Sequence, residues 1–357
     1  MTERSVREPE QPVNYAMLSL FQYLASILVI LVHCQRLFEN EVLHFTQKSM
    51  FGRMAVPFFL ISSAFMFKSS LAKKQDMKLY IKRVLKQYLL WSGIYVPYAL
   101  AYFWTLPLPK HYAPLALLAG LLYIGLCYQL WYIPAFLLGL QLVHFLYKKL
   151  GPKKTFVLLL VLYALGAIET YHAYLAPSLL TDWYDAYAKL FFTSRNGLFY
   201  TPIFIFMGYY LYDHFDSPSF RVHRLQKVAL AFGLFCLEGT IIFQHEGIDK
   251  NFFFLLPFVT VYLVNACLKS SFLKTYDLQY LKQMSVALYF SHPIFIELAR
   301  YGFRTLPLSY PDRGKLIFVT ALFGSHLFGV AMLLVRDRRE KQKIPSNGEE
   351  LDKITNQ

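Results

Sequence analysis

The sequence alternates between long apolar blocks and short stretches rich in lysine and arginine. A helix needs about 20 mostly apolar residues to cross the hydrocarbon core of a bilayer, and it satisfies its backbone hydrogen bonds internally in that solvent. The pattern therefore predicts an all-α polytopic membrane protein with about ten transmembrane helices. The predicted spans are 15–35, 53–68, 84–104, 131–147, 155–173, 198–213, 227–243, 252–268, 284–300 and 315–335.

The composition excludes an ordinary water-soluble domain. Of the 357 residues, 56% are hydrophobic and 16% are charged, whereas soluble domains carry about 25% charged residues. The net charge of +14 is carried by the polar stretches between apolar blocks, as in membrane proteins, so we expect no nucleic-acid partner. The cysteines form no CxxC pair and imply neither a disulfide framework nor a metal site. They are Cys34, Cys127, Cys236 and Cys267.

The basic residues set the orientation of the chain. Five polar stretches carry the excess of lysine and arginine, and a ten-span arrangement puts all five on one side, with both termini in the cytoplasm. The apolar stretch 113–126 contains Pro114, Gly120 and Gly125, and we interpret it as a re-entrant or interfacial piece. Counting it as an eleventh span would move the later basic loops outside. The basic stretches are 68–86, 148–154, 221–227, 269–282 and 336–343.

Three segments follow from these spans. Residues 1–14 form a cytoplasmic N-terminal segment, and no cleavage-site pattern follows the first apolar block, which we therefore interpret as a retained helix. Residues 15–335 form one membrane domain. Residues 336–357 form a polar cytoplasmic tail, which we expect to be disordered.

Ionisable side chains within the apolar blocks mark candidate functional positions, because each costs about 3 kcal/mol at membrane depth. His33 ends the first span, Arg53 opens the second after a short loop, and His292 lies within the ninth. A histidine is a suitable general base near neutral pH, and an arginine holds a phosphate, a carboxylate or a developing oxyanion. The combination suits acyl transfer to a hydroxyl, although histidines at helix ends also occur as plain interfacial residues.

Other polar and aromatic residues have less specific interpretations. Glu297 and Arg300 have the spacing of an interfacial ion pair, whereas Glu238 has no evident partner in the sequence. Trp131 stands where an aromatic belt at the membrane surface is expected. Arg195 precedes the sixth span, either in a turn that presents it at the outer face or in a plain helix-entry turn.

Five blocks in chain order resemble the acyltransferase family 3 membrane proteins: LVILVHC, RMAVPFFLISSAFMF, QLWYIPAFLLG, RNGLFYTPIFIFMGYYL and MSVALYFSHPIF. The second and fifth match the family patterns R-x-x-V-P-x-F-F-x-x-S and S-x-x-x-Y-x-x-H-P. The LWY and RNGLF blocks resemble the Gram-positive branch that includes membrane domains of serine/alanine racemases from vancomycin resistance. The resemblance implies a ten-span protein of the bacterial plasma membrane that moves an acyl group, often acetyl, from acyl-CoA to an acceptor.

The resemblance also implies roles for individual positions. His33 corresponds to the family's essential histidine in the first span, Arg53 to the arginine that opens the second, and His292 to the histidine of the fifth block. The family usually has arginine or lysine eleven residues before the first histidine, where it is thought to help engage the acyl donor; here that position is Gln22. Gln129 likewise replaces a histidine that is frequent before LWY.

The expectation is therefore an integral membrane acyltransferase that uses acetyl-CoA or another acyl-CoA as co-substrate. Gln22, Lys82 and Arg83 would engage the donor from the cytoplasmic side, where basic side chains attract its phosphates. The acceptor would be a hydroxyl of a cell-envelope glycan or of a lipid-linked precursor. The alternative is a transporter or exporter of a glycan or polar small molecule on the same scaffold, which the uncharged Gln22 favours. A non-catalytic scaffold is disfavoured by the retained histidines and arginine.

Overall fold

The computed structural model describes residues 12–245 and 247–343, and every regular element in that part of the chain is helical. The elements are α1 (Tyr15–His33), α2 (Glu41–Phe45), η1 (Thr46–Phe51), α3 (Gly52–Ala72), α4 (Met77–Ile94), α5 (Val96–Thr105), η2 (Lys110–Tyr112), α6 (Ala113–Ala119), η3 (Gly120–Ile124), α7 (Tyr132–Tyr171), η4 (His172–Tyr174), α8 (Leu179–Phe191), α9 (Thr201–Asp213), α10 (Pro218–Arg221), α11 (Arg224–Gln244), α12 (Leu256–Leu268), α13 (Gln279–Gly302) and α14 (Tyr310–Lys343).

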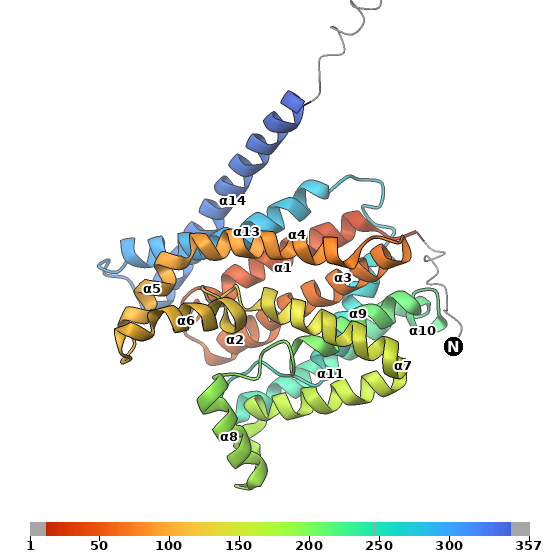
Figure 1. Cartoon of the computed structure of the whole chain (residues 1–357), viewed down its shortest axis with the longest axis horizontal. Coiled ribbons are helices and arrows are strands. Elements are labelled where there is room, and N and C mark those ends of the chain that lie inside the picture. The colour runs from red at the N-terminus through yellow and green to blue at the C-terminus, as the bar shows by residue number, and fades with distance from the viewer. Residues whose placement is uncertain (1–11, 246, 344–357) are drawn as a thin grey trace, which may run out of the picture.

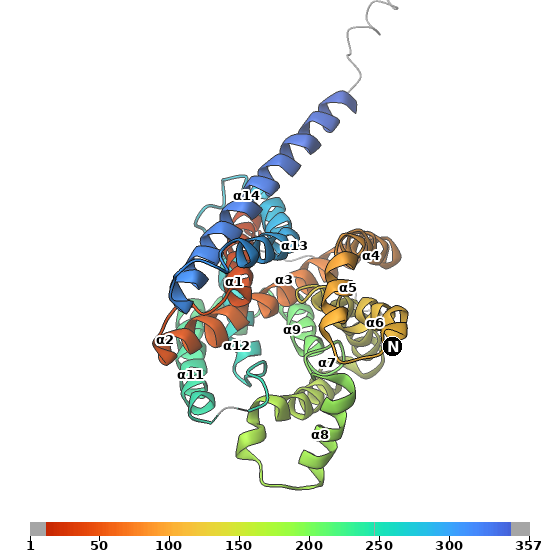
Figure 2. The ribbon, with the colours of Figure 1, turned by 90° about the vertical axis from the view of Figure 1, so that its left-hand side faces the viewer.

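The long helices lie roughly side by side in one bundle (Figure 1). Helix α1 packs against α3 and α13, and α3 also packs against α9 and α12. Viewed along the bundle, α1 and α3 lie near its centre, with α13 and α14 on one side and α7 on the other (Figure 2). The first helix therefore contacts helices from distant parts of the chain.

The surface of the bundle matches a lipid environment. Five helical stretches are long and apolar enough to cross a membrane, and α14 exposes large apolar side chains such as Val319, Phe323 and Leu327. Exposed apolar area is unfavourable in water by about 25 cal/mol per Å², but not in hydrocarbon. The structure confirms the predicted all-α fold, and its long apolar helices agree with a membrane protein. The five stretches are Tyr15–His33, Glu41–Ala72, Tyr132–Tyr174, Arg224–Gln244 and Tyr310–Arg339.

Two of the predicted spans, 131–147 and 155–173, fall within the single element α7. Gly151 interrupts it with a φ of 72°, a conformation that glycine adopts readily, and Pro152 follows. The chain reverses direction there, so α7 forms a hairpin of two arms (Figure 1). The span predicted at 84–104 is also divided, at Tyr95 between α4 and α5. Pro97 lies just beyond the break and supplies no N–H to the preceding turn.

Two other helices are shorter than predicted. Helices α9 and α12 have 13 residues each, because the residues expected at their starts, 198–200 and 252–255, form irregular segments instead. The stretch 113–126 is interrupted as predicted, with α6 and η3 ending at Gly125. The hydroxyl of Tyr88 donates to the Leu121 carbonyl over 2.6 Å and fixes this piece to α4.

The predicted boundaries at the two ends of the chain fare differently. Helix α14 continues to Lys343, so the prediction that the tail is disordered from residue 336 is wrong for its first eight residues. The rest of the tail, 344–357, lies outside the described residues, as do residues 1–11 of the N-terminal segment. At the other end, Asn14 caps α1 by accepting a hydrogen bond from the Met17 amide. Its side chain also donates to the carbonyls of Ser270 and Phe272, each over 2.8 Å. The start of α1 is thereby tied to the loop after α12.

Candidate active site

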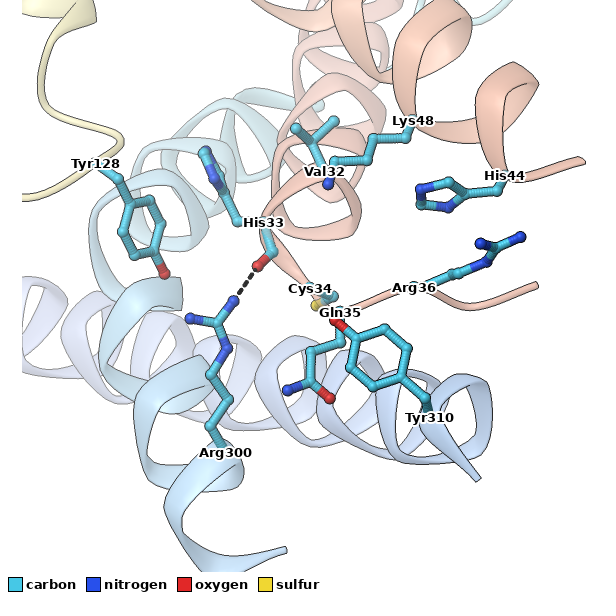
Figure 3. A pocket seen from close by; sticks show the side chains of 10 residues that line it. All are labelled: Val32, His33, Cys34, Gln35, Arg36, His44, Lys48, Tyr128, Arg300 and Tyr310. Atoms are coloured by element: carbon cyan, nitrogen blue, oxygen red, sulfur yellow. Dashed lines mark hydrogen bonds between the residues drawn. The ribbon is translucent and has the colours of Figure 1, made fainter. Parts of the chain in front are cut away.

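A cavity of about 460 Å³ lies where α1 ends (Figure 3). Segments that are distant in sequence form its wall: the end of α1 with the residues that follow, α2 and η1, the loop before α7, α13, and the start of α14. Figure 3 shows Tyr128 and Arg300 on one side of the cavity and His44 and Arg36 on the other. The lining residues are Val32, His33, Cys34, Gln35, Arg36, His44, Lys48, Tyr128, Arg300 and Tyr310.

The backbone of His33 is held by a cation. Helix α1 ends at His33 because Cys34 is extended, with a ψ of 162°, which leaves carbonyls of the last turn without intrahelical donors. The Nη2 of Arg300 donates to the His33 carbonyl over 2.8 Å, and a positive charge is favourable at a helix C-terminus. Arg300 also forms the predicted pair with Glu297, at 2.8 Å. Its contact with His33 was not predicted.

The imidazole of His33 lies between two other rings. Its centroid is 4.5 Å from that of Tyr128 and 5.5 Å from that of His292, whose ring is within 20° of parallel. His292 Nδ1 lies 2.9 Å from the Leu288 carbonyl, so this nitrogen carries the proton, and Nε2 of the neutral ring is an acceptor. Within the described residues, this buried Nε2 and the buried Tyr128 hydroxyl have no hydrogen-bond partner. Of the two residues, Tyr128 lines the cavity, so its hydroxyl can meet a bound substrate.

Arg53 lies in the first turn of α3, and its Nη2 forms an ion pair with Oδ1 of Asp249 at 3.1 Å. Its charge acts on His33 electrostatically, but no hydrogen bond joins the two among the described residues. Burial alone would raise the pKa of Asp249, yet the guanidinium groups of Arg53 and Arg195 outweigh burial and hold it below its ordinary value. Asp249 therefore remains ionised at neutral pH and orients Arg53.

Arg195 belongs to the same polar cluster as Arg53 and Asp249. It donates to Asn251 Oδ1 over 3.2 Å, and Asn251 donates to Asp249 over 2.7 Å. The guanidinium also lies 4.5 Å above the ring of Trp131, a favourable cation–π contact. Trp131 is buried, so its interpretation as a lipid-facing belt residue is wrong. Asp249 and Asn251 were not predicted as site residues, because both lie in an irregular loop.

A buried carboxylate supports the turn that carries Arg195. Glu169 accepts hydrogen bonds from the Ser194 amide over 2.7 Å, from Thr193 over 2.9 Å and from the Tyr184 hydroxyl over 3.0 Å. These contacts satisfy a charge that would otherwise be costly to bury. Glu169 was missed by sequence reasoning, although an acidic residue inside an apolar block is a usable signal.

Glu238, for which the sequence offered no partner, caps the start of α12. It accepts from the amides of Phe254 and Leu255 and from the Tyr171 hydroxyl. A carboxylate is stabilising at a helix N-terminus, where amides lack intrahelical partners. Glu238 therefore has a structural explanation that needs no substrate.

The proposed donor-side residues lie away from the cavity. Gln22 is buried in α1, where its Nε2 is 3.4 Å from Ser62 Oγ and its carbonyl accepts from Ser285 over 3.0 Å. Eleven residues along a helix amount to about 16 Å, so Gln22 shares a face with His33 but lies three turns deeper. Lys82 and Arg83 are exposed on α4 and do not line the cavity. The structure thus joins His33 with His292 and places Arg53 nearby.

Comparisons with known proteins agree with this architecture. The sequence profile of the acyltransferase domain matches residues 16–335. Curated relatives include an amino-acid racemase from Enterococcus faecalis, 28% identical over 69% of this chain and 35% of the relative. A serine/alanine racemase from Enterococcus gallinarum is 30% identical over 77% of this chain and 40% of the relative.

The chain spans less than half the length of these relatives. No solved structure matches it. The profile covers most of the chain, including the helix that ends at His33 and the helix that carries His292. The chain therefore belongs to the acyltransferase family 3 of membrane proteins.

Proposed function

We propose that the protein moves an acyl group, acetyl in the simplest case, from acyl-CoA to a hydroxyl of a cell-envelope glycan or a lipid-linked acceptor. One observation carries the proposal: the His33 imidazole borders a cavity at the end of α1 and stacks against His292. A ring nitrogen beside a space of substrate size is the arrangement that general-base catalysis requires. Membership of the acyltransferase family agrees with it.

We place this protein in the bacterial plasma membrane with ten crossings and cytoplasmic termini. The two arms of α7 count as two crossings, α4 and α5 together as one, and α1, α3, α9, α11, α12, α13 and α14 as one each. Contacts among the basic segments support this orientation. Lys269 donates to the Phe215 carbonyl over 2.5 Å, and Arg224 donates to the Lys269 carbonyl. These segments and the start of α1 therefore gather at the same end, which the positive-inside rule makes cytoplasmic.

Each step of the proposed reaction can be assigned to a residue that lines the cavity or lies near it. His33 takes the proton of the acceptor hydroxyl as its oxygen attacks the thioester carbonyl. The carbon–sulfur bond then breaks, and the departing coenzyme A thiolate recovers the proton from His33. The hydroxyl of Tyr128, which lines the cavity, would donate to the developing oxyanion, and the charge of Arg53, outside the lining, would stabilise it at longer range. His292 supports the His33 ring and offers an acceptor nitrogen beside it.

The donor would approach from the opposite end of the bundle. Lys82 and Arg83 are exposed on α4 and would attract the phosphates of acyl-CoA. The buried amide of Gln22 would contact the acyl-bearing arm on its way to His33. Gln22 can form hydrogen bonds with this arm, although it carries no charge. Its hydrogen bond to Ser62 Oγ is long, at 3.4 Å, and therefore weak.

The test is acetyl-CoA turnover by the purified protein in nanodiscs, with isolated envelope polymer as acceptor. His33→Ala should lower turnover by about 10²- to 10⁴-fold, the usual contribution of a general base. His144→Ala is the matched control, because it removes an imidazole bonded to Tyr209 over 3.4 Å and does not line the cavity. Unchanged acylation in His33→Ala would exclude this mechanism.

Transport of a polar small molecule is the second candidate. The neutral Gln22, where the family usually has a basic residue, favours it, and the matched relatives are named for amino-acid and serine/alanine racemases. An amino acid is then the class of solute to test. Transport predicts uptake into proteoliposomes without consumption of acyl-CoA, and uptake that persists in the absence of any acyl donor.

A further inference from the structure

The cavity beside His33 has a wall with positive charge and no carboxylate. Arg36, Lys48 and Arg300 line it, and none of the lining residues is aspartate or glutamate. Arg36 is paired with Glu41 at 2.7 Å, and Arg300 with Glu297 at 2.8 Å. These pairs leave the charge of the third cation, Lys48, to be explained.

Lys48 has no ion-pair or hydrogen-bond partner within the described residues, although its side chain is half-buried. The carboxylate of Asp249 lies within electrostatic reach of it, but that carboxylate is bonded to Arg53. A partly buried cation without a counter-charge is unfavourable. The buried Nε of Arg300 also lacks an acceptor in the same part of the chain. An anion in the cavity would satisfy both groups.

A second cavity has the opposite character. It has a volume of about 310 Å³ and lies between α1, α3, α11 and α12, together with Phe51 of η1. All of its lining side chains are apolar, so it fits a hydrocarbon chain and offers nothing to a sugar or a phosphate. The lining residues are Phe21, Leu24, Ala25, Leu28, Phe51, Met54, Ala55, Phe58, Val228, Phe232, Val259 and Leu263.

Neighbouring residues of α1 and of η1 line the two cavities. On α1, Leu28 lines the apolar cavity and Val32, one turn later, lines the basic cavity. On η1, Lys48 lines the basic cavity and Phe51 the apolar one. At Gly52, the start of α3 packs closely against α1, because a Cβ there would lie 2.2 Å from Val32 Cγ2. One helical turn corresponds to about 6 Å, a distance that one amphiphilic molecule spans.

We infer that the acyl acceptor is an anionic amphiphile: its phosphate-type headgroup binds at Lys48 and Arg300, and its hydrocarbon chain lies in the apolar cavity. The role as acceptor rests on the proposed acyltransferase function; the binding does not. This placement brings hydroxyls attached to the headgroup next to His33. A soluble polyanion leaves the apolar cavity unused, and a neutral lipid leaves Lys48 without a counter-charge.

The experiment measures binding without any acyl donor. The full-length protein in detergent is titrated with hexadecyl phosphate, hexadecanol and inorganic phosphate, and occupancy is read by native mass spectrometry. The wild type should bind the alkyl phosphate about tenfold more tightly than the alcohol, a modest gain from one charge pair. Lys48→Gln should remove this preference, while Lys189→Gln, which removes an exposed lysine from α8, should retain it.

A second variant tests the chain site. Leu28→Trp fills the apolar cavity and should weaken binding of both amphiphiles; Leu24→Trp replaces it if the first variant does not fold, as judged by size-exclusion chromatography. Equal binding of phosphate and alcohol by the wild type, or an undiminished preference in Lys48→Gln, would overturn the inference. Inorganic phosphate that binds as tightly as the alkyl phosphate would overturn it too, because the chain would then contribute nothing.

The binding experiment can succeed or fail independently of the test of the proposed acyltransferase function. Acylation of a water-soluble polymer by the wild type, together with no preference for the alkyl phosphate, would overturn this inference alone. Selective binding of the alkyl phosphate by a protein whose acylation does not depend on His33 would overturn the proposed reaction alone.

Discussion

The imidazole of His292 lies 5.5 Å from that of His33, with the two rings within 20° of parallel. One histidine comes from the end of α1 and the other from the interior of α13. Because Nδ1 of His292 is bound to a backbone carbonyl of its own helix, its ring cannot rotate without losing that bond. The second histidine therefore presents a ring of fixed orientation beside the first.

His292→Phe separates this support from the chemistry of the ring nitrogens. Phenylalanine keeps a flat ring beside His33 but has no Nε2 acceptor. We expect kcat to fall by at least about tenfold, in the range of acid–base contributions, with the KM for acyl-CoA unchanged. Ser291→Ala is the control, since that hydroxyl donates to the Ala287 carbonyl of its own helix, over 2.8 Å. If His292→Phe were fully active, His292 would contribute to packing and not to the reaction.

Asp249→Asn should change the dependence of stability on pH. The pKa of Asp249 is held below its ordinary value in the folded protein. The ionised carboxylate therefore stabilises the fold above the ordinary aspartate pKa of about 4, and this contribution is lost as the pH falls through the lowered value. We expect the wild type to melt at a higher temperature than Asp249→Asn from neutral pH down to about pH 5, with the difference shrinking in stronger acid.

Thermal unfolding in detergent at a series of pH values measures this difference. Asp182→Asn is the matched control, because Asp182 is an exposed carboxylate on α8. A difference in melting temperature between wild type and Asp249→Asn that stays constant down to the most acidic condition would contradict the ion pair with Arg53.

Gln22→Arg restores the basic residue that the family usually carries. The side chain is buried between α1 and α3, so we expect the free energy of unfolding to fall by about 3 kcal/mol, the cost of an arginine at membrane depth. In exchange, the KM for acetyl-CoA should fall while kcat changes little, because the new charge meets the donor before the reaction. Gln22→Met, of similar size but uncharged, separates the effect of charge from that of packing. A KM unaffected by Gln22→Arg would remove this position from the donor path.

Glu238→Ala tests the cap of α12. The substitution leaves the amides of Phe254 and Leu255 and the Tyr171 hydroxyl without their common acceptor. Each buried unpaired donor costs about 1–3 kcal/mol, so we expect a loss of about 3 kcal/mol in the free energy of unfolding, measured by thermal or chemical denaturation. Glu238→Gln, which keeps an acceptor oxygen, should lose less. If the two variants were equally stable, the cap would not be the reason for a carboxylate at this position.

The helical architecture could be predicted because the bilayer leaves the backbone few choices. Apolar blocks in lipid must form helices, and their limits agree with the structure within a few residues, as for Tyr15–His33 against 15–35. The reversal of the chain at Gly151 falls in the loop predicted between the spans 131–147 and 155–173. The break at Tyr95 and the loss of helix before Leu256 were not predicted, because hydropathy averages over windows longer than a single turn. The extension of α14 past Arg336 was missed because polarity was equated with disorder.

The site could be predicted only in part. His33 and His292 were identified by ionisable character within apolar blocks and by resemblance to a family. The Arg53–Asp249 pair has partners 196 positions apart, and no local pattern in the sequence connects the two. Lys48 was missed for a different reason: it lies in η1, in the short stretch between the first two predicted spans, where one lysine carries no signal until the cavity around it is known.

The hydrogen bond from Arg300 to the His33 carbonyl joins residues 267 positions apart. A ribosome that adds about 5–20 residues per second therefore completes the helix containing His33 tens of seconds before Arg300 exists. During that interval α1 must reside in the bilayer without the helix that later anchors its end. Helix α1 is apolar, with a mean hydropathy of 2.1, and Gln22 at its middle carries no charge. Both features suit a helix that must be stable in the bilayer before its partner helices are made. The site can therefore assemble only after α13 is made, and a chain cut before α13 contains the first histidine without the arginine that binds its carbonyl and the ring that stacks beside it.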